Sequence, residues 1–241
     1  MPVAIVTGGS RGIGRAIAQR LGSDGVSVVV NYHTDRDAAE QVVTHIEAAG
    51  GRAVAEQADV ADPPSLRGLF DIAEQRFGGL DILVNNVGTA RFGPIAETTD
   101  EDFDHTFAVN TRATFVALRE AANRLRDNGR IVLVSSGVTA THRPDSGIYG
   151  ASKAAGEELV RVIARELGSR GITANSVLPG VTRTEALVAA TTASATDSVV
   201  RQTPLGRMGE PDDIADIVAF LTSDAARWIT GATVHAGGGL F

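Results

Sequence analysis

Short apolar runs alternate along the whole chain with longer segments whose hydrophobic residues have helical spacing. The runs are continuously apolar, which is typical of strands buried on both faces of a parallel sheet. Because strand and helix alternate without a linker or low-complexity tract, the pattern predicts one α/β domain over residues 1–241, a doubly wound Rossmann-like parallel sheet. The six predicted strands are residues 3–7, 26–32, 52–59, 80–86, 129–136 and 171–179.

Three of the helical segments carry an apolar stripe that should pack against this sheet. The first two are residues 35–49 and 63–77, and the third begins near Tyr149. The predicted inward residues are Ala39, Val42, Val43 and Ile46 in the first segment, Leu66, Leu69, Phe70 and Ala73 in the second, and Ala155, Leu159, Val162 and Ile163 in the third.

Composition narrows the possible classes of function. The chain of 241 residues is 43% hydrophobic and 21% charged, with a formal net charge of −7 and no basic block, which argues against a nucleic-acid partner. It has no cysteine, so disulfides, thiolate metal sites and thiol catalysis are excluded. The five histidines are scattered without ligand spacing, and we therefore expect no metal site.

The same features indicate where the protein works. The first predicted strand begins at the third residue, and no apolar run reaches membrane-spanning length. A chain without cysteine also suits a reducing compartment. We expect a cytoplasmic protein without a signal peptide or a membrane partner.

A glycine cluster directly follows the first predicted strand. In TGGSRGIG, residues 7–14, three glycines lie where a helix begins: Gly8, Gly12 and Gly14. Glycines allow a tight turn and a close backbone approach, and the free N–H groups and dipole of a helix N-terminus favour an anion. Such a cluster can be an ordinary turn. At the first strand–helix junction of an alternating chain, however, it predicts a binding site for a dinucleotide pyrophosphate.

Tyr149 precedes Lys153 by four residues at the start of a predicted helix. This spacing places the phenol and the ammonium on the same helix face. One interpretation is a partly exposed tyrosine beside a solvated lysine. The other is a phenol whose pKa is lowered by the neighbouring cation, so that it can exchange protons near neutral pH.

Further motifs, in order along the chain, favour the second interpretation. They are the residue 7–14 cluster, ADV at 58–60, NNVG at 85–88, Asn110, Ser136 thirteen residues before Tyr149, Lys153, and PGVTRT at 179–184. With these motifs the chain resembles the short-chain dehydrogenase/reductase family over essentially its whole length. Residues 204–231 look most like the 3-ketoacyl-carrier-protein-reductase subgroup. The resemblance implies an oxidoreductase that interconverts a small-molecule ketone and a secondary alcohol by hydride transfer.

The resemblance also implies roles for individual residues. Tyr149 would be the acid/base, Lys153 would tune it and grip the cofactor ribose, Ser136 would hold the substrate oxygen, and Asn110 would hold a water; these four would form the catalytic tetrad. The implied cofactor contacts are Gly8, Ser10, Arg11, Gly12, Ile13, Gly14, Asn31, Asp59, Val60, Asn86, Gly88, Tyr149, Lys153, Pro179, Gly180, Thr182 and Thr184.

Structural roles remain open for several of these residues. Asp59 could simply end the third strand, Asn86 could be a turn residue, and Ser136 could cap the next segment. Pro179–Gly180 forms a strand-ending turn under either interpretation. Asn110 falls in mid-helix, where asparagine is intrinsically unfavourable, so we expect a local bend there.

Two features favour NADP(H) over NAD(H). NAD-specific folds usually end the second strand with an acidic residue that binds the ribose 2′-OH, whereas this strand ends with Asn31 and Tyr32. Related enzymes carry a basic residue at the position of Arg11, where it reaches the 2′-phosphate. Asp35 and Asp37 would instead stabilise the start of the next helix. An NAD-linked alcohol or sugar dehydrogenase and a non-catalytic dinucleotide sensor remain alternatives.

Two further expectations concern a lid and assembly. Residues 184–203, rich in alanine, threonine and serine, follow the sixth predicted strand, where a lid over the substrate or a plain surface helix would fit. Relatives in the family imply a homotetramer, and the small residues Ala151, Ala154 and Gly156 would allow helices of two subunits to approach closely.

Overall fold

A computed structural model describes residues 1–190 and 192–241. In this part of the chain seven strands form one sheet in the order β3-β2-β1-β4-β5-β6-β7, and every neighbouring pair is parallel. The predicted doubly wound sheet is therefore confirmed. The strands are β1 (Val3–Val6), β2 (Ser27–Tyr32), β3 (Arg52–Gln57), β4 (Leu80–Asn85), β5 (Leu125–Val134), β6 (Thr173–Pro179) and β7 (Thr233–Ala236).

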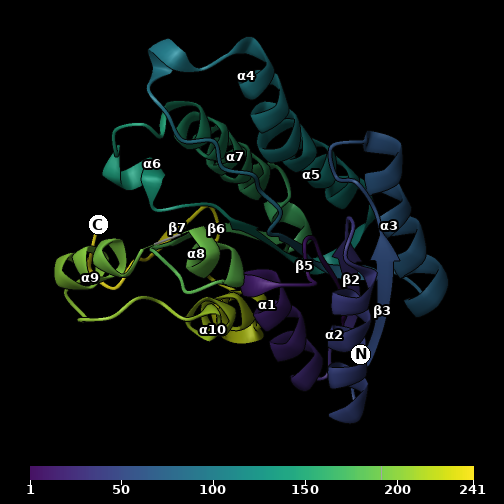
Figure 1. Ribbon diagram of the computed structural model, residues 1–241. Helices are drawn as coiled ribbons and strands as arrows, with labels where there is room; N and C mark the ends of the chain where they lie inside the picture. The colour runs from purple at the N-terminus through teal and green to yellow at the C-terminus, as the bar shows by residue number, and fades with distance from the viewer. Residues whose placement is uncertain (191) are drawn as a thin grey trace.

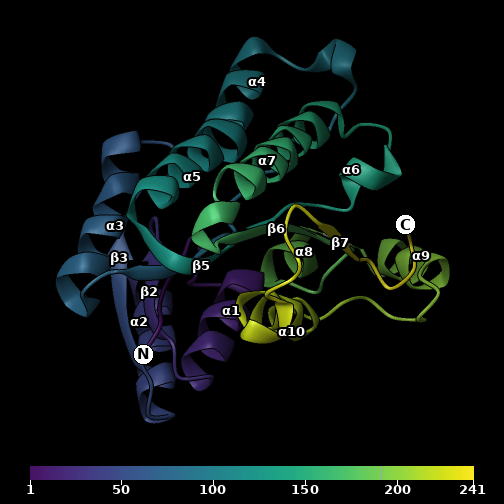
Figure 2. The ribbon, with the colours of Figure 1, turned by 180° about the vertical axis from the view of Figure 1, so that it is seen from behind.

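Helices cover both faces of the sheet (Figure 1; Figure 2 gives the view from behind). One face packs against α1 (Gly12–Ser23), α2 (Arg36–Ala48) and α10 (Pro211–Thr222), and the other against α3 (Pro63–Phe77), α5 (Ala113–Arg124) and α7 (Gly147–Glu166). The remaining helical elements are η1 (Ile95–Glu97), α4 (Asp100–Phe107), η2 (Ala108–Arg112), α6 (Val138–Thr141), η3 (Gly168–Arg170), α8 (Glu185–Ala190), α9 (Ala193–Gln202) and η4 (Asp224–Ala226). Across the described ranges, no helix is both long enough and apolar enough to cross a membrane.

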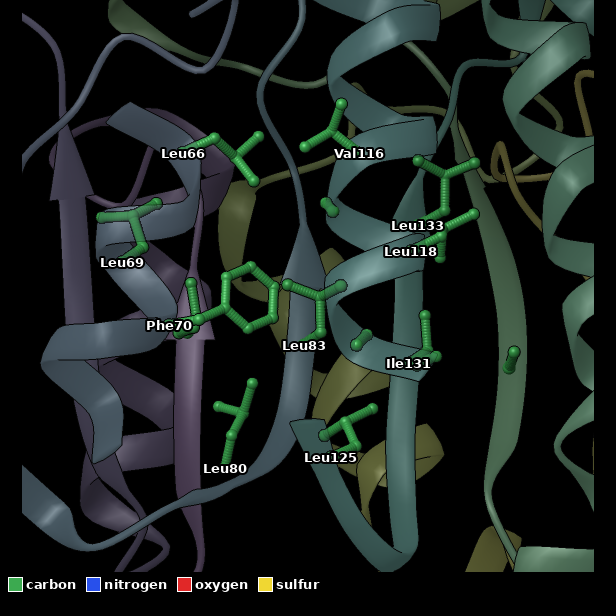
Figure 3. Close-up of a cluster of buried hydrophobic side chains, with 14 of the residues drawn as sticks. Leu66, Leu69, Phe70, Leu80, Leu83, Val116, Leu118, Leu125, Ile131 and Leu133 are labelled. Atoms are coloured by element: carbon green, nitrogen blue, oxygen red, sulfur yellow. The ribbon is translucent and has the colours of Figure 1, made fainter. Parts of the chain in front are cut away.

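Two hydrophobic layers hold the helices to the sheet. Figure 3 shows part of one layer, where Phe70 of α3 and Leu83 of β4 lie between the sheet and the helices, both at most 1% exposed. Removing such side chains from water is the main favourable term of folding. The predicted inward stripes of α2 and α3 are buried as expected: Ala39, Val42, Val43, Ile46, Leu66, Leu69, Phe70 and Ala73.

The inward face of α7 differs from the prediction. Ile163 is buried, but Val162 is 46% exposed, and Ala155 and Leu159 are only partly covered. The buried face of α7 includes two charged residues, Lys153 and Glu157. Its full set is Ser152, Lys153, Gly156, Glu157, Val160, Ile163 and Ala164. Hydrophobic spacing identified the wrong face because charged side chains occupy part of the buried one.

The polar ends of β1 and β4 meet beside each other in the sheet. Strand order reverses here, since β2 and β3 continue on one side of β1 while β5, β6 and β7 continue on the other side of β4. In open parallel sheets, ligands bind in the crevice outside the carboxyl ends of the strands at such a reversal. The glycine cluster at residues 7–14 and the NNVG segment at 85–88 both lie at this point.

Candidate active site

The cradle formed by residues 7–14 depends on its glycines. Gly8 and Gly12 have φ angles of 62° and 53°, in the left-handed region that favours glycine. A Cβ on Gly14 would overlap the carbonyl oxygen of Gly8, so the first turn of α1 can approach the strand end only without a side chain there. Within the cradle Ser10 is buried, Ile13 is partly buried, and Arg11 is exposed to solvent.

Asn31 supports the cradle from inside the protein. Its side chain is buried, and Oδ1 accepts a 3.0 Å hydrogen bond from the Gly8 N–H. Its Nδ2 donates to the carbonyl oxygens of Tyr32 and Ala58, at 3.2 and 3.1 Å. The side chain expected to contact the cofactor thus links the cradle to the ends of β2 and β3.

Asn86 braces the cradle from the neighbouring strand. Its Nδ2 donates to the carbonyl of Thr7 at 3.0 Å, and its backbone N–H donates to Thr7 Oγ1 at 2.9 Å. On the other side, Asp59 follows β3 and its Oδ1 accepts from the Ala61 N–H at 2.9 Å. Val60, between Asp59 and Ala61, is buried. One carboxylate oxygen of Asp59 is engaged in a local turn, and the side chain is still 47% exposed.

The N-terminus of α1 attracts an anion in this structure. Arg11, its N-cap residue, makes no side-chain capping hydrogen bond, and the first turn has no acidic residue. The carboxylate of Glu185, from the start of α8, lies there instead, next to Gly12 and paired with Arg15. The hydrogen bond from its own backbone N–H, together with Arg15 and Gly12, lowers the pKa of Glu185. A carboxylate at this position stands in for a phosphate oxygen, so the cradle fits a dinucleotide pyrophosphate.

Ser136 and Tyr149 meet beyond the end of β5. The Ser136 hydroxyl lies close enough to the Tyr149 phenol to act on its pKa, and Ser136 Oγ accepts weakly from the Val138 N–H at 3.4 Å. Burial raises the pKa of Tyr149, and the Ser136 hydroxyl opposes that rise. The expected lowering of this pKa by Lys153 is therefore wrong for the protein by itself, because burial of the phenol outweighs the other effects.

Lys153 is buried beside the same strand end. Its Nζ donates a 3.1 Å hydrogen bond to the carbonyl oxygen of Val134, the last residue of β5. Burial lowers the pKa of Lys153 to about 8, while the negative charge of Glu157 acts in the opposite direction. A Cβ on Gly88 would lie 2.6 Å from this Nζ, which explains why the NNVG segment ends in glycine.

Asn110 lies in a break between two helices, as its mid-helix position predicted. Residues Ala108–Arg112 form a π-helical turn, η2, between α4 and α5. The Asn110 side chain accepts from the Thr89 N–H at 2.8 Å and donates to Ser152 Oγ at 2.9 Å. It therefore joins the loop after β4 to α7, one residue before Lys153.

The end of β6 is hydrogen-bonded to the loop after β5 and to β7. Pro179 accepts a 2.9 Å hydrogen bond from the Gly137 N–H, so this strand end is tied to the loop that carries Ser136. Gly180 N–H donates to Ala236 of β7 at 2.9 Å, and Thr182 Oγ1 bonds back to the Gly180 carbonyl at 3.1 Å.

Thr184, just before α8, reaches the cradle itself. Its methyl carbon would be 3.1 Å from a Cβ on Gly12. Residues 184–203, the predicted lid, include two helices, α8 and α9, and residue 191 between them lies outside the described residues.

Three residues near Tyr149 and Lys153 escaped sequence analysis. The ring of Phe92 meets that of Tyr149 edge to face, with centroids 5.5 Å apart, and the Arg143 guanidinium lies 5.4 Å from the Phe92 ring centre. No local pattern marks these two loop residues. Glu157 is different, because it follows Lys153 by the same four-residue spacing that links Lys153 to Tyr149.

Comparisons with known proteins agree with this arrangement. A family model described as enoyl-(acyl carrier protein) reductase matches residues 8–241. The versicolorin reductase of Emericella nidulans is 42% identical, with 99% of this chain and 95% of the relative covered. An NADPH-dependent aldehyde reductase-like protein of Arabidopsis thaliana is also 42% identical, over 98% of this chain and 93% of the relative.

A solved structure is equally similar. The angucycline C-6 ketoreductase LanV with bound NADP superimposes with a TM-score of 0.94, at 44% identity, covering 99% of this chain and 95% of that one. Fold and site together define an oxidoreductase of the dinucleotide-binding class. The chain belongs to the short-chain dehydrogenase/reductase family, as its motifs predicted.

Proposed function

We propose that this protein reduces a ketone to a secondary alcohol with NADPH. The observation that carries the proposal is the convergence of Ser136, Tyr149 and Lys153 at the end of β5, beside a glycine cradle that already attracts an anion. Relatives described as ketoreductases, among them LanV, support the same reaction. A non-catalytic sensor would have no need for the complete tetrad.

The preference for the phosphorylated cofactor rests on charge. The residue near the end of β2 is Asn31, which is uncharged and buried beneath the cradle. The nearby acidic residue Asp35 caps α2 by accepting from the Ala38 N–H at 3.0 Å. Arg11 is exposed at the start of α1, with its guanidinium free of an ion pair to any described residue. A cation without a competing anion favours a 2′-phosphate. LanV was crystallised with NADP.

Bound NADPH would supply the hydride, and the side chains would manage the proton and the developing charge. Tyr149 keeps its proton at neutral pH because burial raises the pKa of its phenol, which suits a donor to the new alkoxide oxygen. Ser136 donates to the same oxygen and stabilises the charge that forms on it. Lys153, held at Val134, would hydrogen-bond the nicotinamide ribose.

The substrate would enter beside Phe92. This ring packs against Tyr149 and forms an apolar wall next to the proton donor. A flat or cyclic ketone could lie against such a wall with its carbonyl toward Ser136 and Tyr149, although a 3-oxoacyl chain would also fit the apolar, small-sided segment 184–203. We include in this proposal the lid role of residues 184–203, a single domain over residues 1–241, assembly as a homotetramer and a cytoplasmic location.

The test is NADPH consumption with a panel of 3-oxoacyl thioesters, monocyclic ketones and polycyclic aromatic ketones. We expect turnover with at least one class, and higher kcat/KM with NADPH than with NADH. Binding of NADPH without turnover of any ketone or alcohol would contradict the proposal and favour a sensor.

A further inference from the structure

Glu157 is a buried carboxylate that the proposed reaction leaves unused. It lies on α7, and its side chain is only 6% exposed. Ser135 Oγ donates a 2.6 Å hydrogen bond to Glu157 Oε1, and an Arg161 nitrogen approaches the other oxygen at 3.8 Å. Burying a carboxylate is unfavourable unless other groups compensate its charge, so its inward position needs a reason.

Glu157 and Lys153 together hold consecutive residues of one strand end. Lys153 donates to the carbonyl of Val134, and Glu157 accepts from the hydroxyl of Ser135. The next residue is Ser136, whose hydroxyl lies beside the Tyr149 phenol. Because side chains four residues apart lie one above the other on a helix, one face of α7 supports the whole end of β5.

The two charges also act on each other. Burial lowers the pKa of Lys153 to about 8, and the negative charge of Glu157 opposes that fall. Tyr149, one turn earlier, is the other titratable group on this face, and Arg161 lies on the outer side of Glu157. The elements packed against Lys153 and Glu157 contribute uncharged groups: the Val134 carbonyl and Ser135 hydroxyl from β5, the Asn110 amide from η2, and Gly88 from the loop after β4.

We propose that Glu157 is a positioning residue whose buried carboxylate is the counter-charge of Lys153 and fixes the strand end that carries Ser136. The inference rests on the proposed function, since it assigns Glu157 a role toward a residue of that site. Without this carboxylate, burial lowers the pKa of Lys153 and no negative charge opposes that change. Lys153 then loses its proton at a lower pH, and the site loses its positive charge closer to neutrality.

The sequence allows a direct measurement, because Lys153 is the only lysine among the 241 residues. Lysine labelled with carbon-13 at Cε gives a single side-chain NMR signal, whose shift with pH titrates Lys153 without cofactor or substrate. In Glu157→Gln the acceptor for Ser135 remains and the charge is removed. We expect the midpoint to fall by roughly one pH unit relative to wild type.

The matched control is Glu158→Gln, the same change one residue further on. Glu158 is 69% exposed and pairs with Arg161, so its removal should leave the midpoint unchanged. Glu157→Met, which replaces the carboxylate with an apolar chain of similar size, is the second variant and should lower the midpoint as far. If either folded Glu157 variant titrates like Glu158→Gln, the proposal is wrong.

Kinetics give an independent readout. With a ketone substrate and NADPH, the fall of kcat/KM at high pH should move to lower pH in Glu157→Gln by the same interval as the NMR midpoint, and Glu157→Asp should restore it. A loss of thermal stability with an unchanged pH profile would show a purely structural role and overturn the proposal. Absence of ketone turnover in the wild type would contradict the proposed function alone, since the NMR titration still tests Glu157.

Discussion

Tyr149 is a titratable group that lies beside a second candidate residue, Ser136. Tyr149→Phe removes one hydroxyl and keeps the ring that packs against Phe92. We expect kcat to fall at least about a hundredfold, in the range for loss of a general acid, with NADPH affinity nearly unchanged. Stopped-flow turnover and fluorescence titration of NADPH check the two parts. Turnover near the wild-type rate would exclude Tyr149 as the proton donor.

Arg11 is the residue at which cofactor preference can be tested. Arg11→Ala should raise KM for NADPH roughly tenfold and leave KM for NADH almost unchanged, because one charge-assisted contact to the 2′-phosphate is lost. Arg165→Ala, which removes an exposed arginine in the last turn of α7, serves as the control. A wild-type enzyme that prefers NADH would contradict the assignment, and the site near Asn31, His33 and Thr34 would then have to accommodate a plain ribose.

At the scale of elements, α8 begins with a carboxylate where the cofactor's phosphates would bind. Glu185 lies next to Gly12 and pairs with Arg15, and a pyrophosphate would have to displace it. Glu185→Gln removes the competing charge and should lower the Kd for NADPH about three- to tenfold. Calorimetric titration measures this, with Glu47→Gln of α2, an exposed acid at the far end of that helix, as control. Weaker binding in Glu185→Gln would mean that Glu185 assists the cofactor.

Elements that leave a pattern in their own stretch of sequence could be predicted. The first six strands, the inward stripes of α2 and α3, the cradle and the irregular turn at Asn110 all follow from hydrophobic spacing, glycine content or helix propensity. Strand β7 was missed because its four residues are only partly buried or exposed and include His235, so they form no continuous apolar run.

Features that depend on tertiary contacts could not be predicted. The buried face of α7 includes Lys153 and Glu157, which only the polar end of β5 can compensate. The Asn31 side chain points inward because the carbonyl oxygens of Tyr32 and Ala58 accept its hydrogen bonds there. For the same reason the direction of the Tyr149 pKa shift was wrong, since it depends on how deeply the folded chain buries the phenol.

The whole molecule presents an apolar face that suits assembly. Phe103 of α4, Phe115 of α5 and Val162 of α7 are each more than 40% exposed; α5 continues from α4 through η2, and both helices pack against α7 (Figure 1). Gly156 cannot contribute to close helix contact, because it faces Leu133 at the sheet.

We expect sedimentation to show a homotetramer, and Phe115→Glu to dissociate it into smaller species by placing a charge in the interface. Lys153 titration and NADPH binding would report whether the variant remains folded. A stable wild-type monomer near 25.0 kDa would contradict the expectation.

The surface of this protein has no lysine, because its 22 basic residues are 21 arginines and the buried Lys153. Aldehydes and reactive ketones form Schiff bases with neutral lysine amines, and sugars glycate them, so an enzyme that handles carbonyl compounds is exposed to damage by its own substrates. Here the one lysine amine is buried and hydrogen-bonded to the end of β5. After prolonged incubation with a simple aldehyde, peptide mass spectrometry should find Lys153 unmodified, both with and without NADPH. The burial that tunes Lys153 also leaves carbonyl compounds no lysine on the surface to cross-link.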